Sequence, residues 1–228
     1  IGKIIKQLNN KNSLLDLKIQ NILIGDLIYD SYLKKYKKET INLKDKKFKN
    51  FLEVSLDYFF FWIEQFKTKK IKSVISSQSV YMSSLPLRIA ISKSCLGLVA
   101  NPERLYRLTK KIIYSDKEFE LFNKIKKNID KQNLNAGIKI SEKKIKKRFQ
   151  GKLGSDLSYL SKTAYGNFTK TRVLNNNKKL KVLIAPHSFS DAPHQLGKHL
   201  FADYYEWLKF IILNASDKYD WYIKCHPN

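Results

Sequence analysis

The sequence has little arginine, cysteine and histidine, and it has no long apolar run. Its 228 residues include 44 lysines and arginines and carry a formal net charge of +24, but only five of the basic residues are arginine. Nucleic-acid sites favour arginine because its guanidinium makes bidentate contacts. The lysines are spread along the whole chain, and asparagine and isoleucine are abundant, which is typical of AT-rich coding. The composition therefore favours coding bias over a nucleic-acid partner.

Cysteine is scarce, and the two that are present, Cys95 and Cys225, are far apart and form no CxxC pair. Isolated cysteines make no disulfide framework and indicate a reducing compartment, so we expect a cytoplasmic protein. The most apolar run, YFFFWI at 58–63, is flanked by acidic residues and is too short to span a membrane. The excess of lysine still allows peripheral contact with an anionic inner-membrane surface.

The two ends of the sequence both look cut. The first residue is Ile1, and no signal or transit pattern follows it. The last residues, from 219 to 228, read YDWYIKCHPN and fall inside what looks like a motif. We therefore expect a fragment of a longer protein. Its C-terminal half would be truncated, and the fragment would be inactive alone.

Apolar spacing predicts strands that alternate with helices, which is typical of an α/β fold with parallel sheets in two halves. Residues 150–178 are rich in Gly, Ser, Thr and Asn and read as a linker. We therefore predict an N-terminal α/β domain over 1–150, a linker over 151–179 and the start of a C-terminal α/β domain over 180–228. The expected strands are 17–26, 71–77, 96–100, 180–185 and 219–224, and the expected helices are 50–66, 84–94, 115–129, 140–149 and 203–213.

All four histidines lie between positions 187 and 226, in a segment that is predicted to fold as strand, loop, helix and strand. A crossover of this kind makes its two strands parallel. His187 and His226 each follow the carboxyl end of one of these strands, so they should meet at one edge of one sheet. Ligands bind along this edge in open α/β sheets.

The loop over 186–202 is long for such a unit and leads into the N-terminus of the helix over 203–213, where free N–H groups attract anions. Asp203 also reads as the cap of this helix. Histidine donors, a lysine and a helix N-terminus together suit a phosphate-bearing ligand, although His194 and His199 could instead be solvated loop residues. The residues that we expect to bind phosphate are His187, His194, His226 and Lys224.

Zinc is the chemical alternative at this edge. Ligands could come from His187, His194, His199 and Asp191, but their spacing matches no zinc finger and no HExxH helix. The sequence also contains no P-loop, no GxGxxG motif and no GxSxG elbow. We therefore expect neither a bound metal nor a cofactor.

Several of these stretches have a family resemblance. The segments KVLIAPHSFSDAPH, LFADYYEWL and DWYIKCHPN resemble the C-terminal half of bacterial surface and capsular polysaccharide biosynthesis proteins, which look like glycosyltransferases of the GT-B type. Two earlier segments, ILIGDLIYDSYLKK and SVYMSSLPLRIAI, are similar to the N-terminal half of those proteins. The resemblance is scattered over most of the chain and is dense only from residue 180 onward.

The resemblance implies two Rossmann-like halves (GT-B-like), a nucleotide-sugar donor, a glycan or lipid-linked acceptor and no bound metal. A His-Pro pair after a strand lies near the donor phosphates in similar enzymes, which assigns this role to His226 and Pro227, with Lys224 close by. The base that activates the acceptor would come from the N-terminal half, and Asp26 and Asp30 are its candidates, although Asp26 could equally cap a helix. Arg88 could help to bind an anionic group, but we favour its interpretation as an exposed helix arginine.

Two other functions stay open on the residues alone. One is a basic binding module for nucleic acid or another anionic polymer, which would bind tightly and with a steep salt dependence. The other is a metal-dependent hydrolase. The leading prediction is a glycosyltransferase-like protein of bacterial surface or capsule polysaccharide synthesis.

Overall fold

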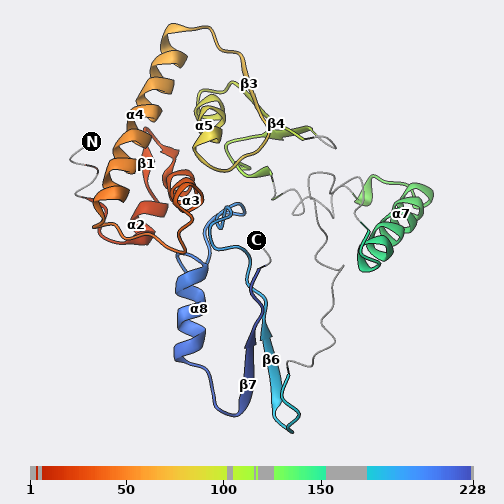
Figure 1. Cartoon of the computed structure of the whole chain (residues 1–228). Coiled ribbons are helices and arrows are strands. Elements are labelled where there is room, and N and C mark those ends of the chain that lie inside the picture. Colours follow the sequence, from red (N-terminus) through yellow and green to blue (C-terminus); the bar gives the residue numbers. More distant parts are fainter. Residues whose placement is uncertain are drawn as a thin grey trace. The chain divides into compact units, whose positions relative to one another are not determined.

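The computed structural model describes residues 4, 7–101, 105–115, 117, 126–152 and 174–226 (Figure 1). Its residues group into two compact units. The first unit comprises residues 1–117, 183–216 and 223–226, and the second comprises 118–182, 217–222 and 227–228. The candidate site below lies entirely within the first unit.

The first unit begins with a short helix, a hairpin and two longer helices. They are α2 (Lys11–Leu15), β1 (Lys18–Ile19), β2 (Ile22–Leu23), α3 (Gly25–Tyr36) and α4 (Lys46–Thr68). The predicted strand over 17–26 is therefore wrong in its extent. Gln20 and Asn21 both adopt positive φ, 50° and 61°, and this makes a two-residue turn between antiparallel β1 and β2.

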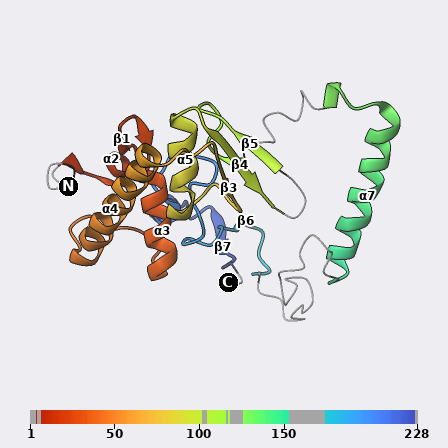
Figure 2. The same ribbon diagram turned by 90° about the horizontal axis from the view of Figure 1, so that it is seen from above.

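A mixed three-stranded sheet follows. Its elements are β3 (Ser73–Ser76), the 3₁₀ turn η1 (Met82–Ser84), α5 (Leu85–Ser92), β4 (Leu96–Ala100) and β5 (Leu105–Leu108). β3 and β4 are parallel, with Ser73 opposite Leu96, and β5 joins β4 in the antiparallel direction. Figure 2 shows α5 lying against this sheet, as a parallel crossover requires.

The remaining described elements are α7 (Lys131–Phe149), β6 (Leu180–Ile184), α8 (Tyr204–Leu213) and β7 (Tyr219–Ile223). β6 and β7 pair in a two-stranded sheet. The N–H of Lys224, just after β7, donates to the carbonyl of Ile184 at the end of β6 over 2.8 Å. The two strands therefore end at the same edge and run in the same direction, as predicted (Figure 1).

The main core lies between the N-terminal helices. α4 buries Phe48, Leu52, Leu56, Phe59 and Ile63, which recur every three or four residues and so form one face of the helix. This face packs against buried residues of α2, α3 and the hairpin. A smaller cluster, Leu87, Ile91, Val99 and Leu108, joins α5 to the sheet.

The chain is thus a mixed α/β protein with small sheets. Besides the hairpin, the sequence-based prediction missed α3 and β5 and began α7 nine residues late. The predicted linker over 151–179 and the predicted helix over 115–129 lie mostly outside the described residues. The predicted domain boundaries stay a prediction.

Candidate ligand-binding site

Two histidines meet where β6 and β7 end. The ring centroids of His187 and His226 are 5.3 Å apart, with an interplanar angle of 40°. His187 is exposed and His226 is half-buried, so neither ring is part of the core. The predicted adjacency of the two imidazoles at one sheet edge is therefore confirmed.

A polar cavity of about 260 Å³, which we call the edge pocket, lies beside His187. Ser77 follows β3 and Asn101 follows β4, so the pocket also takes in the carboxyl ends of the two parallel strands of the other sheet. Its lining is dominated by hydroxyl, amide and imidazole groups. The lining residues are Ser77, Gln78, Ser79, Val80, Tyr81, Val99, Asn101, Ser115, His187, Asp191, Ala192 and Gln195.

Backbone strain and buried hydroxyl groups mark this pocket as a shaped site. Tyr81 and Ala192, which both line it, have φ values of 61° and 46°, a region that residues with a side chain rarely occupy. Such strain tends to cluster at functional sites. Ser79 and Ser115 are buried with their Oγ atoms 2.9 Å apart, and the Ser115 N–H also donates to the Ser79 Oγ over 2.9 Å.

Asp191 places one carboxylate in the edge pocket. Its Oδ1 accepts hydrogen bonds from the Lys34 Nζ and the Tyr81 hydroxyl, both over 2.7 Å. Burial alone would raise the pKa of Asp191, but these two donors outweigh it and the pKa is lowered. The carboxylate is therefore charged at neutral pH, and within the described parts of the chain its Oδ2 accepts no hydrogen bond.

Behind the pocket, Asp30 and His194 form a buried pair. The Asp30 Oδ1 lies 2.5 Å from the His194 Nδ1, and its Oδ2 accepts the His194 N–H over 3.1 Å. The His194 Nε2 bonds the Ala202 carbonyl over 2.8 Å, and the ring meets Tyr29 edge-on with centroids 5.0 Å apart. Since all of their polar atoms are engaged, the structure places His194 away from a phosphate ligand and Asp30 away from an acceptor. They act instead to fix the loop over 186–202 against α3.

The stability of the protein should depend on pH because of the Asp30–His194 pair. Burial lowers the pKa of His194, but the hydrogen bond and charge of Asp30 outweigh it and the pKa is raised. The pKa of Asp30 is also raised, mainly by burial. A raised histidine pKa contributes stability below the ordinary pKa of the unfolded chain, near 6.5, and that contribution is lost as pH rises through the folded pKa.

We therefore expect the free energy of unfolding to fall between pH 6 and pH 9 because of this pair. Urea unfolding at both pH values measures it. The double variant Asp30→Asn/His194→Gln should lack this decline, and an equal decline in both proteins would contradict the assignment.

Asp26 is also engaged. Its carboxylate receives Arg88 in a bidentate ion pair, with the Nη1 and Nη2 atoms at 2.7 and 2.6 Å, and the Tyr114 hydroxyl donates to it over 2.8 Å. Arg88 is only 4% exposed, so the prediction of an exposed helix arginine is wrong. Asp26 lies in the first turn of α3 and caps no helix. An ion-paired, buried carboxylate of this kind is a structural group rather than an available base.

The other predicted phosphate ligands have simpler positions. Lys224 is exposed directly after β7, two residues before His226. Pro227 lies outside the described residues. The N-terminus of α8 is closed by its own cap, because the Asp203 carboxylate accepts the Glu206 N–H over 2.8 Å and is buried. This confirms the predicted cap and removes the helix N-terminus as an anion site.

A second, more apolar cavity of about 440 Å³, the aromatic pocket, lies on the other side of His187. Its walls come from the loop after β6 and from the first turn of α8. They are Ala185, Pro186, His187, Pro193, His199, Leu200, Phe201, Asp203, Tyr204 and Trp207. His187 therefore lines both pockets.

The sequence analysis named Asp191 only as a zinc ligand and missed Ser79, Tyr81 and Ser115 as site residues. The run SSQS at 76–79, which covers the end of the strand predicted over 71–77, was the available signal, because polar residues at the carboxyl end of a parallel strand face the ligand edge.

No protein-family model, curated protein or solved structure matches this chain. Among the described residues, no group of three or more His, Cys, Asp or Glu side chains is arranged to hold a metal ion. In the same part of the chain, no helix has the length and apolarity needed to cross a membrane.

Proposed function

We propose that this chain is a glycosyltransferase-like protein of bacterial surface or capsule polysaccharide synthesis, and that its two strand-ending histidines bind the phosphates of a nucleotide-sugar donor. The observation that carries the proposal is the pair of imidazoles 5.3 Å apart at the ends of β6 and β7, one of which, that of His187, lines both the edge pocket and the aromatic pocket. Imidazole N–H groups there would donate to phosphate oxygens and stabilise the charge of the leaving nucleotide.

The two pockets suit the two ends of such a donor. Tyr204 and Trp207 give the aromatic pocket flat faces on which a nucleobase could stack. The hydroxyl and amide groups of the edge pocket match the hydrogen-bonding pattern of a sugar. His187 lines both cavities, which supports a role for its imidazole in contacting the phosphates that connect the base and the sugar.

We assign the base to Asp191 instead of Asp26 or Asp30, because Asp191 lies in the edge pocket and its Oδ2 accepts no hydrogen bond from the described residues. The acceptor hydroxyl oxygen would form a bond to the anomeric carbon as its proton passes to Asp191. The bond between that carbon and the phosphate oxygen breaks, and the nucleotide leaves with the electron pair. The acceptor would be a glycan or a lipid-linked sugar, in the cytoplasm or at the inner face of the membrane.

Binding of nucleotides tests this proposal directly. We expect calorimetric titration with UDP, GDP and CMP to show one preferred nucleotide, and His187→Ala or His226→Ala to weaken it by about tenfold, the equivalent of one hydrogen bond to a charged group. The control is Asn50→Ala, which removes an exposed polar side chain of α4 outside both pockets and should change the affinity less than twofold. Unchanged affinity in both test variants would refute the phosphate role.

A specific observation also supports the alternative of a basic binding module. α7 carries six lysines and one arginine against a single acidic residue, Glu142, and buries none of its residues. Such a helix would attract an anionic polymer through counterion release, with an affinity that falls steeply with salt. Titration of a fluorescent oligonucleotide at 50 and 200 mM salt distinguishes the two functions, because the nucleotide site would respond weakly to salt.

A further inference from the structure

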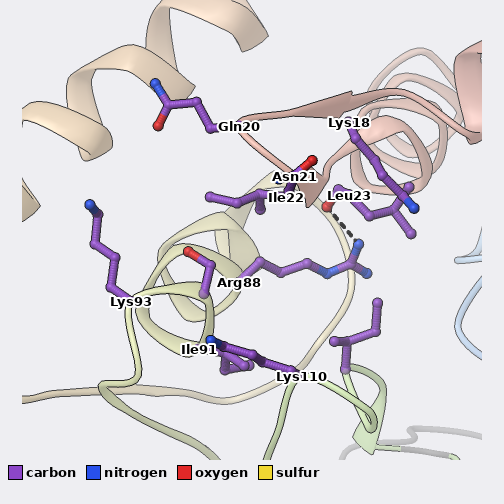
Figure 3. Close-up of a pocket in the computed structure, with 11 residues that line it drawn as sticks. Lys18, Gln20, Asn21, Ile22, Leu23, Arg88, Ile91, Lys93 and Lys110 are labelled. Carbon is purple, nitrogen blue, oxygen red and sulfur yellow. Dashed lines mark hydrogen bonds between the residues drawn. The ribbon is translucent and has the colours of Figure 1, made fainter.

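Another cavity of the first unit lies away from the histidine edge. It measures about 620 Å³ and opens between the β1–β2 hairpin, the end of α5 and the loop after β5 (Figure 3). We call it the hairpin pocket. A volume of this size is within the range of small-molecule sites, about 300–1,000 Å³.

The charge of the hairpin pocket is entirely positive. Lys18, Lys93 and Lys110 reach it from three separate segments, and none of the described lining residues is acidic. In the described parts of the chain none of the three ammonium groups makes an ion pair or hydrogen bond. Like charges gathered at one cavity repel one another, and an anion between them relieves that repulsion.

A buried donor provides the second observation. Arg88 also lines the pocket and is 4% exposed. Its Nη atoms are satisfied by Asp26 and by the Leu23 carbonyl at 2.9 Å, but its Nε has no hydrogen-bond partner among the described residues. A buried donor without a partner is destabilising, so a ligand oxygen at this atom would be stabilising.

The adjacent helix end does not oppose an anion. The C-terminal carbonyls of α5 would disfavour negative charge if they were free. These carbonyls instead accept hydrogen bonds from nearby backbone N–H groups. The Lys93 N–H donates to the carbonyls of Ile89 and Ala90 over 3.1 Å, and the Cys95 N–H donates to the Ala90 carbonyl over 2.9 Å. The cations therefore dominate the field in the pocket.

From these contacts we infer that the hairpin pocket is a second anion site, which takes a phosphate- or diphosphate-bearing ligand. Lys18, Lys93 and Lys110 neutralise its charge, and the Arg88 Nε donates to one of its oxygens. The inference is independent of the histidine site, since the two sets of residues do not overlap.

Calorimetric titration with inorganic pyrophosphate tests the inference. We expect the double variant Lys93→Met/Lys110→Met to weaken pyrophosphate binding at this site at least tenfold. The charge-matched control is Lys70→Met/Lys209→Met, which removes two exposed lysines outside the pocket and should change the affinity less than twofold. Equal losses in the two double variants would mean non-specific attraction to a basic protein and would overturn the inference.

The histidine variants separate this site from the proposed function. In His187→Ala/His226→Ala the hairpin pocket should still bind pyrophosphate, with protection of the hairpin amides around residues 18–23 from hydrogen exchange. If that double variant abolished all binding while the lysine variant did not, the hairpin pocket would be refuted and the histidine site would be supported.

Discussion

Replacing Gly25 by alanine should lower the free energy of unfolding by about 3 kcal/mol or more, at or above the upper end of ordinary overpacking. A Cβ at this position would lie 1.7 Å from the carbonyl oxygen of Leu14 and 2.8 Å from its carbonyl carbon. Both atoms belong to the backbone of α2, so no side-chain rotation can remove the overlap. Either α2 or α3 must move, and the core between them would open.

Gly137→Ala is the matched control, because a Cβ there meets nothing within 4 Å in the exposed helix α7. Alanine should stabilise that helix by about 0.5–1 kcal/mol. Urea unfolding followed by circular dichroism and tryptophan fluorescence measures both changes. A Gly25→Ala protein with wild-type stability would contradict the close approach of α2 and α3.

Replacing Arg88 by methionine should cost about 3–5 kcal/mol, the range for removing one partner of a buried ion pair. Methionine fills much of the same volume but leaves the Asp26 carboxylate buried with the Tyr114 hydroxyl as its remaining side-chain donor. The Leu23 carbonyl loses its hydrogen bond from Arg88 as well. Chemical denaturation at pH 7 gives the size of the loss.

The double variant Asp26→Leu/Arg88→Met tests whether the loss of stability in Arg88→Met comes from the buried Asp26 carboxylate that is left without its ion-pair partner. Removing both charges should restore most of the lost stability, because no buried charge is then left without a partner. Arg107→Met, which removes an exposed arginine of β5, should change stability by less than about 0.5 kcal/mol. A small loss in Arg88→Met would mean that Arg88 is solvated in solution.

Local patterns were enough to predict several elements of the fold. The spacing of Leu52, Leu56, Phe59 and Ile63 indicated α4, and the apolar run over 96–100 matched β4. The hairpin at Gln20 and Asn21 was missed because its turn contains no glycine, the usual residue for positive φ. β5 was missed because LYRL at 105–108 is too short and too polar to stand out from the loops around it.

The candidate site also has parts that the sequence could predict and parts that it could not. The meeting of His187 and His226 could be predicted because it follows from parallel strands alone. The partners of the two aspartates could not, since Arg88 lies 62 residues from Asp26 and His194 lies 164 residues from Asp30. Pairing over such separations is set by tertiary packing, which periodicity within one segment does not contain.

The link between Asp30 and His194 also dictates an order of events at the ribosome. At about 5–20 residues per second, the histidine emerges on the order of ten seconds after its carboxylate partner. Through that interval the Asp30 carboxyl group of the nascent N-terminal segment has no His194 with which to pair. The segment therefore stays incompletely folded, or is bound by a chaperone, until the loop that carries His194 has been synthesised and can pair with Asp30.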